Sequence, residues 1–127
     1  MSDRVVLSRD LLTTAATVQP VDVPLPELGA GVVVPIRPMT AKEWTTFQAD
    51  QIGKNGKPNA NAKIVRERMV IKCCINDDGS PIFTQADIET LGSCRAGVIE
   101  RIVDSILKHS GLATTDVEAI AKNSEET

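Results

Sequence analysis

The chain has 127 residues, 42% hydrophobic and 24% charged, with a formal net charge of -3, which is typical of one soluble globular domain. A pI near 5.1 and an aromatic content of 2% argue against a protein that holds nucleic acid. No apolar run approaches the roughly 18 residues of a membrane span, and the N-terminus lacks a signal-peptide pattern, so we expect a cytosolic protein.

The N-terminal part of the sequence predicts a short helix followed by a β-hairpin. Ser8 is a suitable N-cap for a helix that stops before Pro20, because its hydroxyl can accept from a free amide of the first turn. Residues 21–23 alternate in polarity as a strand does, and residues 32–36 form a second apolar run. A Gly-rich turn at 27–31 separates the two runs, which is the pattern of a hairpin.

The central part predicts two helices joined by a loop. Thr40 and Glu43 form a capping box at the start of a helix that ends by Gly53, since each side chain can accept from the other residue's amide. Residues 53–61 are rich in Gly, Asn and Pro and predict a mobile loop. Apolar residues over 60–75 recur with helical spacing.

The C-terminal half predicts three further helices after a turn at 76–79. Thr84 begins a short helix, in which Asp87 is a shorter substitute for the usual Glu of a capping box. Ser93 is expected to cap a long helix over 94–110, and that helix carries a wide apolar stripe. The stripe favours a core face, with a groove for a partner as the alternative. Its six residues are Val98, Ile99, Ile102, Val103, Ile106 and Leu107.

These elements predict one mainly α-helical domain over residues 1–127, with about five helices and a short N-terminal β-hairpin. Thr115 is expected to cap a last helix that runs through Lys122. A chain of this length buries roughly two thirds of its unfolded surface, which is enough for a core. Residues 1–7 and 123–127 are expected to be flexible, because chain ends are usually poorly anchored.

The charges are segregated along the chain. Residues 54–72 contain six basic residues and one acid, whereas residues 73–93 contain four acids and no base. The segment 116–127 alone carries a net charge of -3. Such a pattern is typical of solvated faces, and the alternative is a surface that pairs with a second copy or a charged partner.

No arrangement of reactive side chains indicates an enzyme. The three cysteines are an odd number, and two of them, Cys73 and Cys74, are adjacent, so core packing is their favoured role. A small thiol enzyme is the alternative, but nothing ties His109 to a cysteine. The Gly-rich and Asp-rich stretches lack the spacing of dinucleotide, Walker and calcium loops. We therefore predict no catalytic residue, no cofactor and no metal.

Several short motifs follow one another in a distinctive order. A Ser-Arg-Asp-Leu-Leu helix precedes the hairpin, and Met-Thr-Ala-Lys-Glu at 39–43 precedes a helix with Arg66 and Arg68. Next come Asp-Asp-Gly-Ser-Pro-Ile-Phe-Thr at 77–84 and a long amphipathic helix that ends in Ser-Gly-Leu at 110–112. This order, over most of the chain, resembles that of the tail assembly chaperones of long-tailed bacteriophages.

The resemblance implies a non-enzymatic protein that binds the tape measure protein, keeps it soluble and helps to recruit the major tail protein. It implies action in the host cell cytoplasm, absence from the mature virion, and self-association as a homo-oligomer. The alternative is a structural tail or head-completion component that stays in the virion.

Many members of that family are also made in a longer form by a -1 ribosomal frameshift. Ala121-Lys122-Asn123 is compatible with the slippery heptamer A-AAA-AAC, so this chain would be the short, non-frameshifted form and its longer form a partner. The candidate contacts for protein partners are the final helix, the apolar stripe and the basic segment. The residues chosen from the last two are Val98, Ile102 and Ile106, and Arg66, Arg68 and Lys72.

Overall fold

The computed structural model describes residues 3–125, leaving out the side chains of Thr114 and of residues 121–125. The described range contains six α-helices and a two-stranded antiparallel sheet. The predicted fold class, a mainly α-helical domain with about five helices and an N-terminal hairpin, is confirmed. The elements are α1 Arg9–Ala15, β1 Val21–Pro24, β2 Val33–Ile36, α2 Ala41–Ala49, α3 Val65–Cys73, α4 Ile88–Gly92, α5 Ala96–Ser110 and α6 Thr114–Glu125, with short 3-10 turns at Pro26–Leu28, Ala60–Ile64 and Gln85–Asp87.

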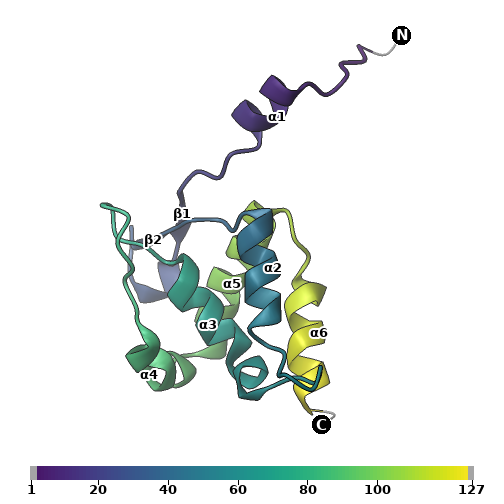
Figure 1. The fold of residues 1–127 in the computed structure, drawn as a ribbon. Helices are drawn as coiled ribbons and strands as arrows, with labels where there is room; N and C mark the ends of the chain where they lie inside the picture. Colours follow the sequence, from purple (N-terminus) through teal and green to yellow (C-terminus); the bar gives the residue numbers. More distant parts are fainter. Residues whose placement is uncertain (1–2, 126–127) are drawn as a thin grey trace.

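Helix α5 provides one wall of the core, and the other elements of the body pack around it. It contacts α3, α6 and strand β1, and Figure 1 shows α2 and α3 in front of it and α6 beside it. All six residues of its predicted apolar stripe are buried, with Ile106 fully inaccessible and Val98 the most exposed at 9%. The core interpretation of the stripe is confirmed.

The hairpin is fixed in register by alternating burial. Val21 pairs with Ile36 and Val23 with Val34, which places Val23, Val34 and Ile36 on the face toward the core. Because the side-chain period of a strand is two, a slip of one residue would expose this face. The N-terminal α1 lies apart from this body, at the end of a segment that leads away from β1 (Figure 1).

The prediction of a single helix over 60–75 is wrong at both ends. Residues Ala60–Ile64 form a 3-10 turn before α3 begins, and after α3 Cys74 is extended and bridges to Ile36. The amide of Ile75 donates to Pro35 O at 3.0 Å. The segment therefore satisfies the free edge of β2, and an apolar pair at the end of a helix has the same sequence pattern as one in a bridge.

Two predicted caps are also corrected. The Ser93 hydroxyl donates back to Glu89 O at 2.9 Å, so it closes α4, and α5 begins at Ala96 with no side-chain cap. Thr115 lies inside α6, which starts one residue earlier. The carboxylate of Asp116 accepts from the amide of Ala113 at 3.0 Å, so an acid of the first turn bonds back to the residue before the helix, as in one half of a capping box.

The other predicted caps are confirmed. Thr40 and Glu43 exchange hydrogen bonds at the start of α2, and Thr84 and Asp87 do the same before α4. Both pairs orient short helices whose few residues give little stability of their own. In the predicted loop, the Gly53 amide donates to Lys57 O at 2.7 Å, and the mobility of 53–61 stays a prediction. Of the predicted flexible ends, 123–125 are helical in α6, and residues 1, 2, 126 and 127 lie outside the described residues.

Candidate partner-binding surfaces

The apolar contact residues expected on α5 lie inside the core. Val98, Ile102 and Ile106 are 9%, 5% and 0% exposed, because α3, α6 and β1 cover this side of the helix. A partner could reach these side chains only if that cover opened. In the described structure these three side chains belong to the core, and their role in contacts with a partner stays a prediction.

The two arginines expected to bind a partner are engaged within the chain. Arg66 forms an ion pair with Glu100 of α5, and the guanidinium of Arg68 lies 3.8 Å from the Asp50 carboxylate after α2. Their side chains are only 29% and 17% exposed. These contacts attach α3 to α5 and to the end of α2. Of the three basic contact residues, only Lys72 is exposed.

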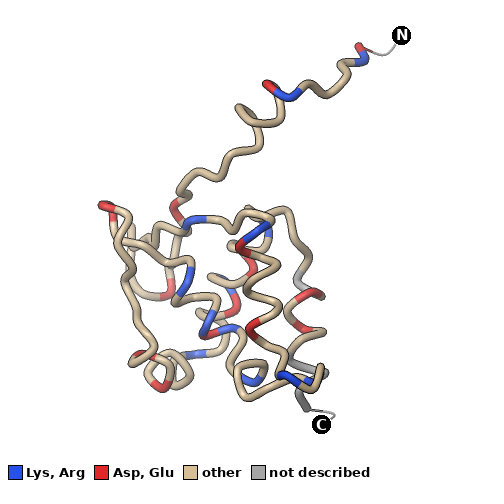
Figure 2. The backbone as a smooth tube through the Cα atoms, in the orientation of Figure 1, with Lys and Arg blue, Asp and Glu red and all other residues tan. Residues whose placement is uncertain are grey.

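The charge segregation of the sequence is partly undone by the fold. Figure 2 shows the basic positions of α3 interspersed with the acidic positions of α2 and α5, whereas the acids of the 76–79 turn and of α4 lie along one edge of the body. Two further ion pairs within the chain join Arg37 to Glu43 and Arg101 to Glu27. The tertiary structure thus interleaves charges that the sequence separates.

Two of the three cysteines are buried in the core. Cys73 and Cys74 are 1% and 0% exposed, which confirms their predicted core role. Burial raises the pKa of both thiols to about 12, because the thiolate would lose its solvation. Cys94 is exposed, and its thiol donates to Thr90 O at 3.3 Å. Within residues 3–125, no cluster of His, Cys, Asp and Glu is arranged to hold a metal ion.

Five of the ten large apolar side chains that are exposed in the described part of the chain belong to the N-terminal arm, which we define as residues 3–14. Five large apolar side chains in it are between 44% and 78% exposed, and α1 buries none of its residues. The arm consists of the helix expected from the sequence and a short apolar segment before it. The sequence pattern did not identify the two as one exposed apolar cluster. The five are Val5, Val6, Leu7, Leu11 and Leu12.

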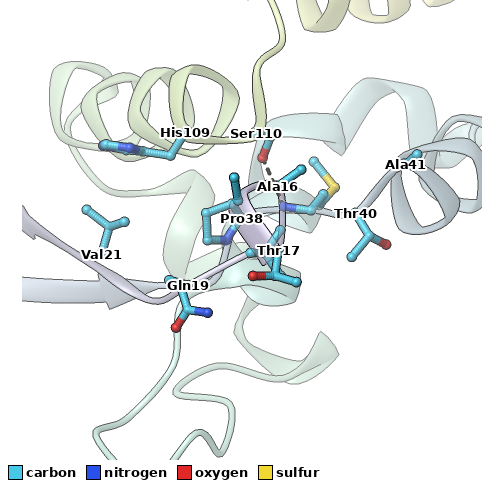
Figure 3. A pocket seen from close by; sticks show the side chains of 12 residues that line it. Ala16, Thr17, Gln19, Val21, Pro38, Thr40, Ala41, His109 and Ser110 are labelled. Atoms are coloured by element: carbon cyan, nitrogen blue, oxygen red, sulfur yellow. Dashed lines mark hydrogen bonds between the residues drawn. The ribbon is translucent and has the colours of Figure 1, made fainter. Parts of the chain in front are cut away.

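A groove of about 750 Å³ lies where the arm joins the body. Figure 3 shows it between the segment after α1, the chain before α2 and the end of α5. One wall is held in place by the Met39 amide, which donates to the Ser110 Oγ at 2.9 Å. The lining contains no Lys, Arg, Asp or Glu. The lining residues of this basal groove are Ala15, Ala16, Thr17, Val18, Gln19, Val21, Pro38, Met39, Thr40, Ala41, His109 and Ser110.

The sequence gives no local signal for the basal groove. Its walls come from three segments far apart in the chain, and the link from residue 39 to residue 110 exists only in the folded state.

In the described part of the chain, no helix has the length and apolar composition needed to cross a membrane.

The fold is similar to that of a solved structure, the tail assembly chaperone of bacteriophage HK97. The two share 20% sequence identity with a TM-score of 0.51, and the match covers 78% of this chain and 94% of the HK97 chain. Neither the protein-family models nor the curated proteins include a match to the chain. At this level of identity the likeness is one of fold, and it agrees with the family that the order of motifs resembles.

Proposed function

We propose that this chain is a tail assembly chaperone that binds the tape measure protein of its phage, keeps it soluble and assists assembly of the tail tube. The observation that carries the proposal is the fold, which is similar over 78% of the chain to the HK97 tail assembly chaperone. The resemblance of the motif order supports the same role independently of the coordinates.

The physical requirements of that role fit the described surface. A tape measure protein is long and helical with an apolar stripe, so it aggregates unless a partner covers the stripe. The N-terminal arm presents apolar side chains to solvent, and the buried, neutral thiols of Cys73 and Cys74 leave the thiol-enzyme alternative without a nucleophile there. Binding without covalent chemistry is therefore the activity that we assign to the chain.

The remaining parts of the proposal follow from this assignment. We place the protein in the host cell cytoplasm as a homo-oligomer that leaves before the virion matures, with the major tail protein as a second partner. We also propose a longer form produced by frameshifting near Ala121-Lys122-Asn123. Codons other than AAA-AAC for Lys122 and Asn123 would exclude this slippery heptamer.

Co-expression with the tape measure protein encoded downstream tests the central claim. We expect the tape measure protein to become soluble and to co-purify with this chain. An Ile106→Asp variant, whose core is disrupted, is the control for nonspecific effects of overexpression. If the tape measure protein stays insoluble and no complex forms, the proposal is wrong.

Mass spectrometry of purified virions tests the alternative of a structural component. We expect the chain to be absent from the particle or present only in traces. Stoichiometric presence would favour a tail or head-completion component.

A further inference from the structure

The N-terminal arm has a short helix and exposed apolar side chains that no part of the described chain covers. An isolated helix shorter than about 12–15 residues is marginal in water, and α1 has seven residues, none of them buried. Its Ser8 cap, whose Oγ accepts from the Leu11 amide at 3.0 Å, orders only the first turn. The apolar side chains at 5–7 and 11–12 are 44–78% exposed, and exposed apolar clusters of this kind mark contact sites.

The basal groove has the matching chemistry. It is open, about 750 Å³ in volume, and lined by small and apolar side chains such as Ala16, Val18 and Pro38 with no charged residue. Residues 5–8 of the arm are also uncharged. An uncharged apolar segment in an uncharged groove loses water on both sides without burying an unpaired charge.

The arm of the same chain is poorly placed to fill this groove. Residues 15–19, which directly follow the arm, already form one wall, and the arm continues away from the body (Figure 1). For α1 to enter the groove, the chain would have to reverse its direction within residues 15–19, which form the wall. An arm that arrives from another molecule needs no such reversal.

We propose that the N-terminal arm of one copy docks in the basal groove of a second copy of this chain. Each copy carries both halves of the contact, so a pair can exchange arms reciprocally. The twelve residues of the arm and the twelve that line the groove then give each side of the pair the roughly 20–30 residues of a stable interface. Either half alone would fall short of that number.

This contact differs from an association driven by the segregated charges of the sequence. The groove lining contains no Lys, Arg, Asp or Glu, and the four charges of the arm, Asp3, Arg4, Arg9 and Asp10, sum to zero. Arm exchange should therefore respond little to salt, whereas pairing of the acidic edge with the basic segment should weaken as salt rises. The inference deepens the self-association part of the proposed function and does not require that the tape measure protein binds.

Sedimentation equilibrium of the purified full-length chain tests the proposal, at low and at high salt. We expect a dimer or larger assembly in the micromolar range, with little change between the two salt concentrations. The variant Leu11→Asp/Leu12→Asp should raise the dissociation constant at least about tenfold, because each leucine loses its burial. The matched control is Leu28→Asp, since Leu28 is similarly exposed, at 59%, but lies on the hairpin loop.

A second variant introduces a negative charge into the groove instead of into the arm. Ala41 lines the groove at the first turn of α2, where an acid is compatible with the helix dipole. Ala41→Glu should therefore leave thermal unfolding of the monomer unchanged and weaken association by about as much as the arm variant. A mixture of the arm variant with Ala41→Glu should recover part of the association, because one intact arm then meets one intact groove.

Four results would overturn the proposal. They are a wild-type chain that is monomeric throughout the micromolar range, an assembly that high salt dissolves, an arm variant that associates as tightly as the wild type, and a mixture that recovers nothing. Loss of association in the Leu28→Asp control with none in the arm variant would place the interface on the hairpin loop. Co-expression of the arm variant with the tape measure protein tests the chaperone role separately. A soluble tape measure protein supports that role, whereas sedimentation of the arm variant alone decides whether arms are exchanged.

Discussion

The N-terminal arm and helix α5 contain the same kinds of aliphatic side chains in opposite environments. Five such residues on the arm are 44–78% exposed, whereas six on α5 are 0–9% exposed. In α5 they recur on one face from Val98 to Leu107, over nearly three turns, and neighbours from α3, α6 and β1 close over that face. In the arm they are split between an extended segment and a seven-residue helix. Burial thus depends on continuity of the apolar face and on the elements available to cover it.

The largest effect is expected where the two regions differ most. Ile106→Ala removes a fully buried side chain from α5 and should lower the free energy of unfolding by about 2–5 kcal/mol, through lost burial and a residual cavity. Leu12→Ala in the arm, at 50% exposure, should change it by less than about 0.5 kcal/mol. Denaturant unfolding at low protein concentration measures both. Similar losses for the two variants would mean that the arm packs on the body.

A pair of helix caps extends the comparison to hydrogen bonds. Thr40→Ala removes the hydroxyl that caps α2 and should cost about 0.5–2 kcal/mol, because α2 packs on the core through Phe47. Ser8→Ala removes the equivalent cap of α1 but should only reduce helicity in the arm. Circular dichroism and thermal unfolding separate the two results. Equal loss of global stability would contradict an independent arm.

The ion pair between Arg66 and Glu100 should contribute less. Its side chains are 29% and 44% exposed, so Arg66→Gln is expected to reduce stability by less than about 1 kcal/mol, and the loss should shrink at high salt. Arg9→Gln on the exposed arm is the matched control and should have no measurable effect. A loss well above that size for Arg66→Gln would mean that the pair is better shielded than its exposure indicates.

The smallest effect is a change in acid stability that belongs to the body alone. Burial opposes the charge of Glu43, but hydrogen bonds from the Thr40 amide and from Arg37 outweigh it, so its pKa is lowered from 4.5. A lowered pKa in the folded state stabilises the fold above pH 4.5, and this contribution is lost as the pH falls through the folded value. Melting temperatures of the wild type should therefore fall more steeply below pH 4.5 than those of Glu43→Gln. Parallel curves would show that Glu43 contributes nothing to the acid transition.

Much of the fold followed from local patterns. The helical spacing of 98–107 predicted a buried face, and the pairs at 40 and 43 and at 84 and 87 predicted capping boxes, because these signals involve residues within one or two turns. The split of 60–75 could not be predicted, since Cys74 and Ile75 take their extended form from β2, which lies almost forty residues earlier. Ser93 was misplaced because a hydroxyl can bond to the helix on either side of it, and Thr115 because α6 begins one residue before it.

Local sequence patterns were also insufficient to predict the candidate partner-binding surfaces. Arg66 and Arg68 have the composition of a basic patch, but α5 and the end of α2 bring acids to them. The stripe on α5 fitted either a core or a groove until its covering elements were known. Long-range neighbours decide such questions, and no spacing within a segment contains them.

By itself the sequence determined the helical class, the presence of the N-terminal hairpin, most of the caps and the absence of a recognisable catalytic motif, because periodicity and backbone hydrogen bonding are set within a few residues. Only the tertiary structure decided which apolar residues are covered. It buried the stripe of α5, engaged the arginines of α3, and left the N-terminal arm uncovered beside an uncharged groove. The physical reason is that burial and charge pairing are properties of surfaces brought together by the whole chain.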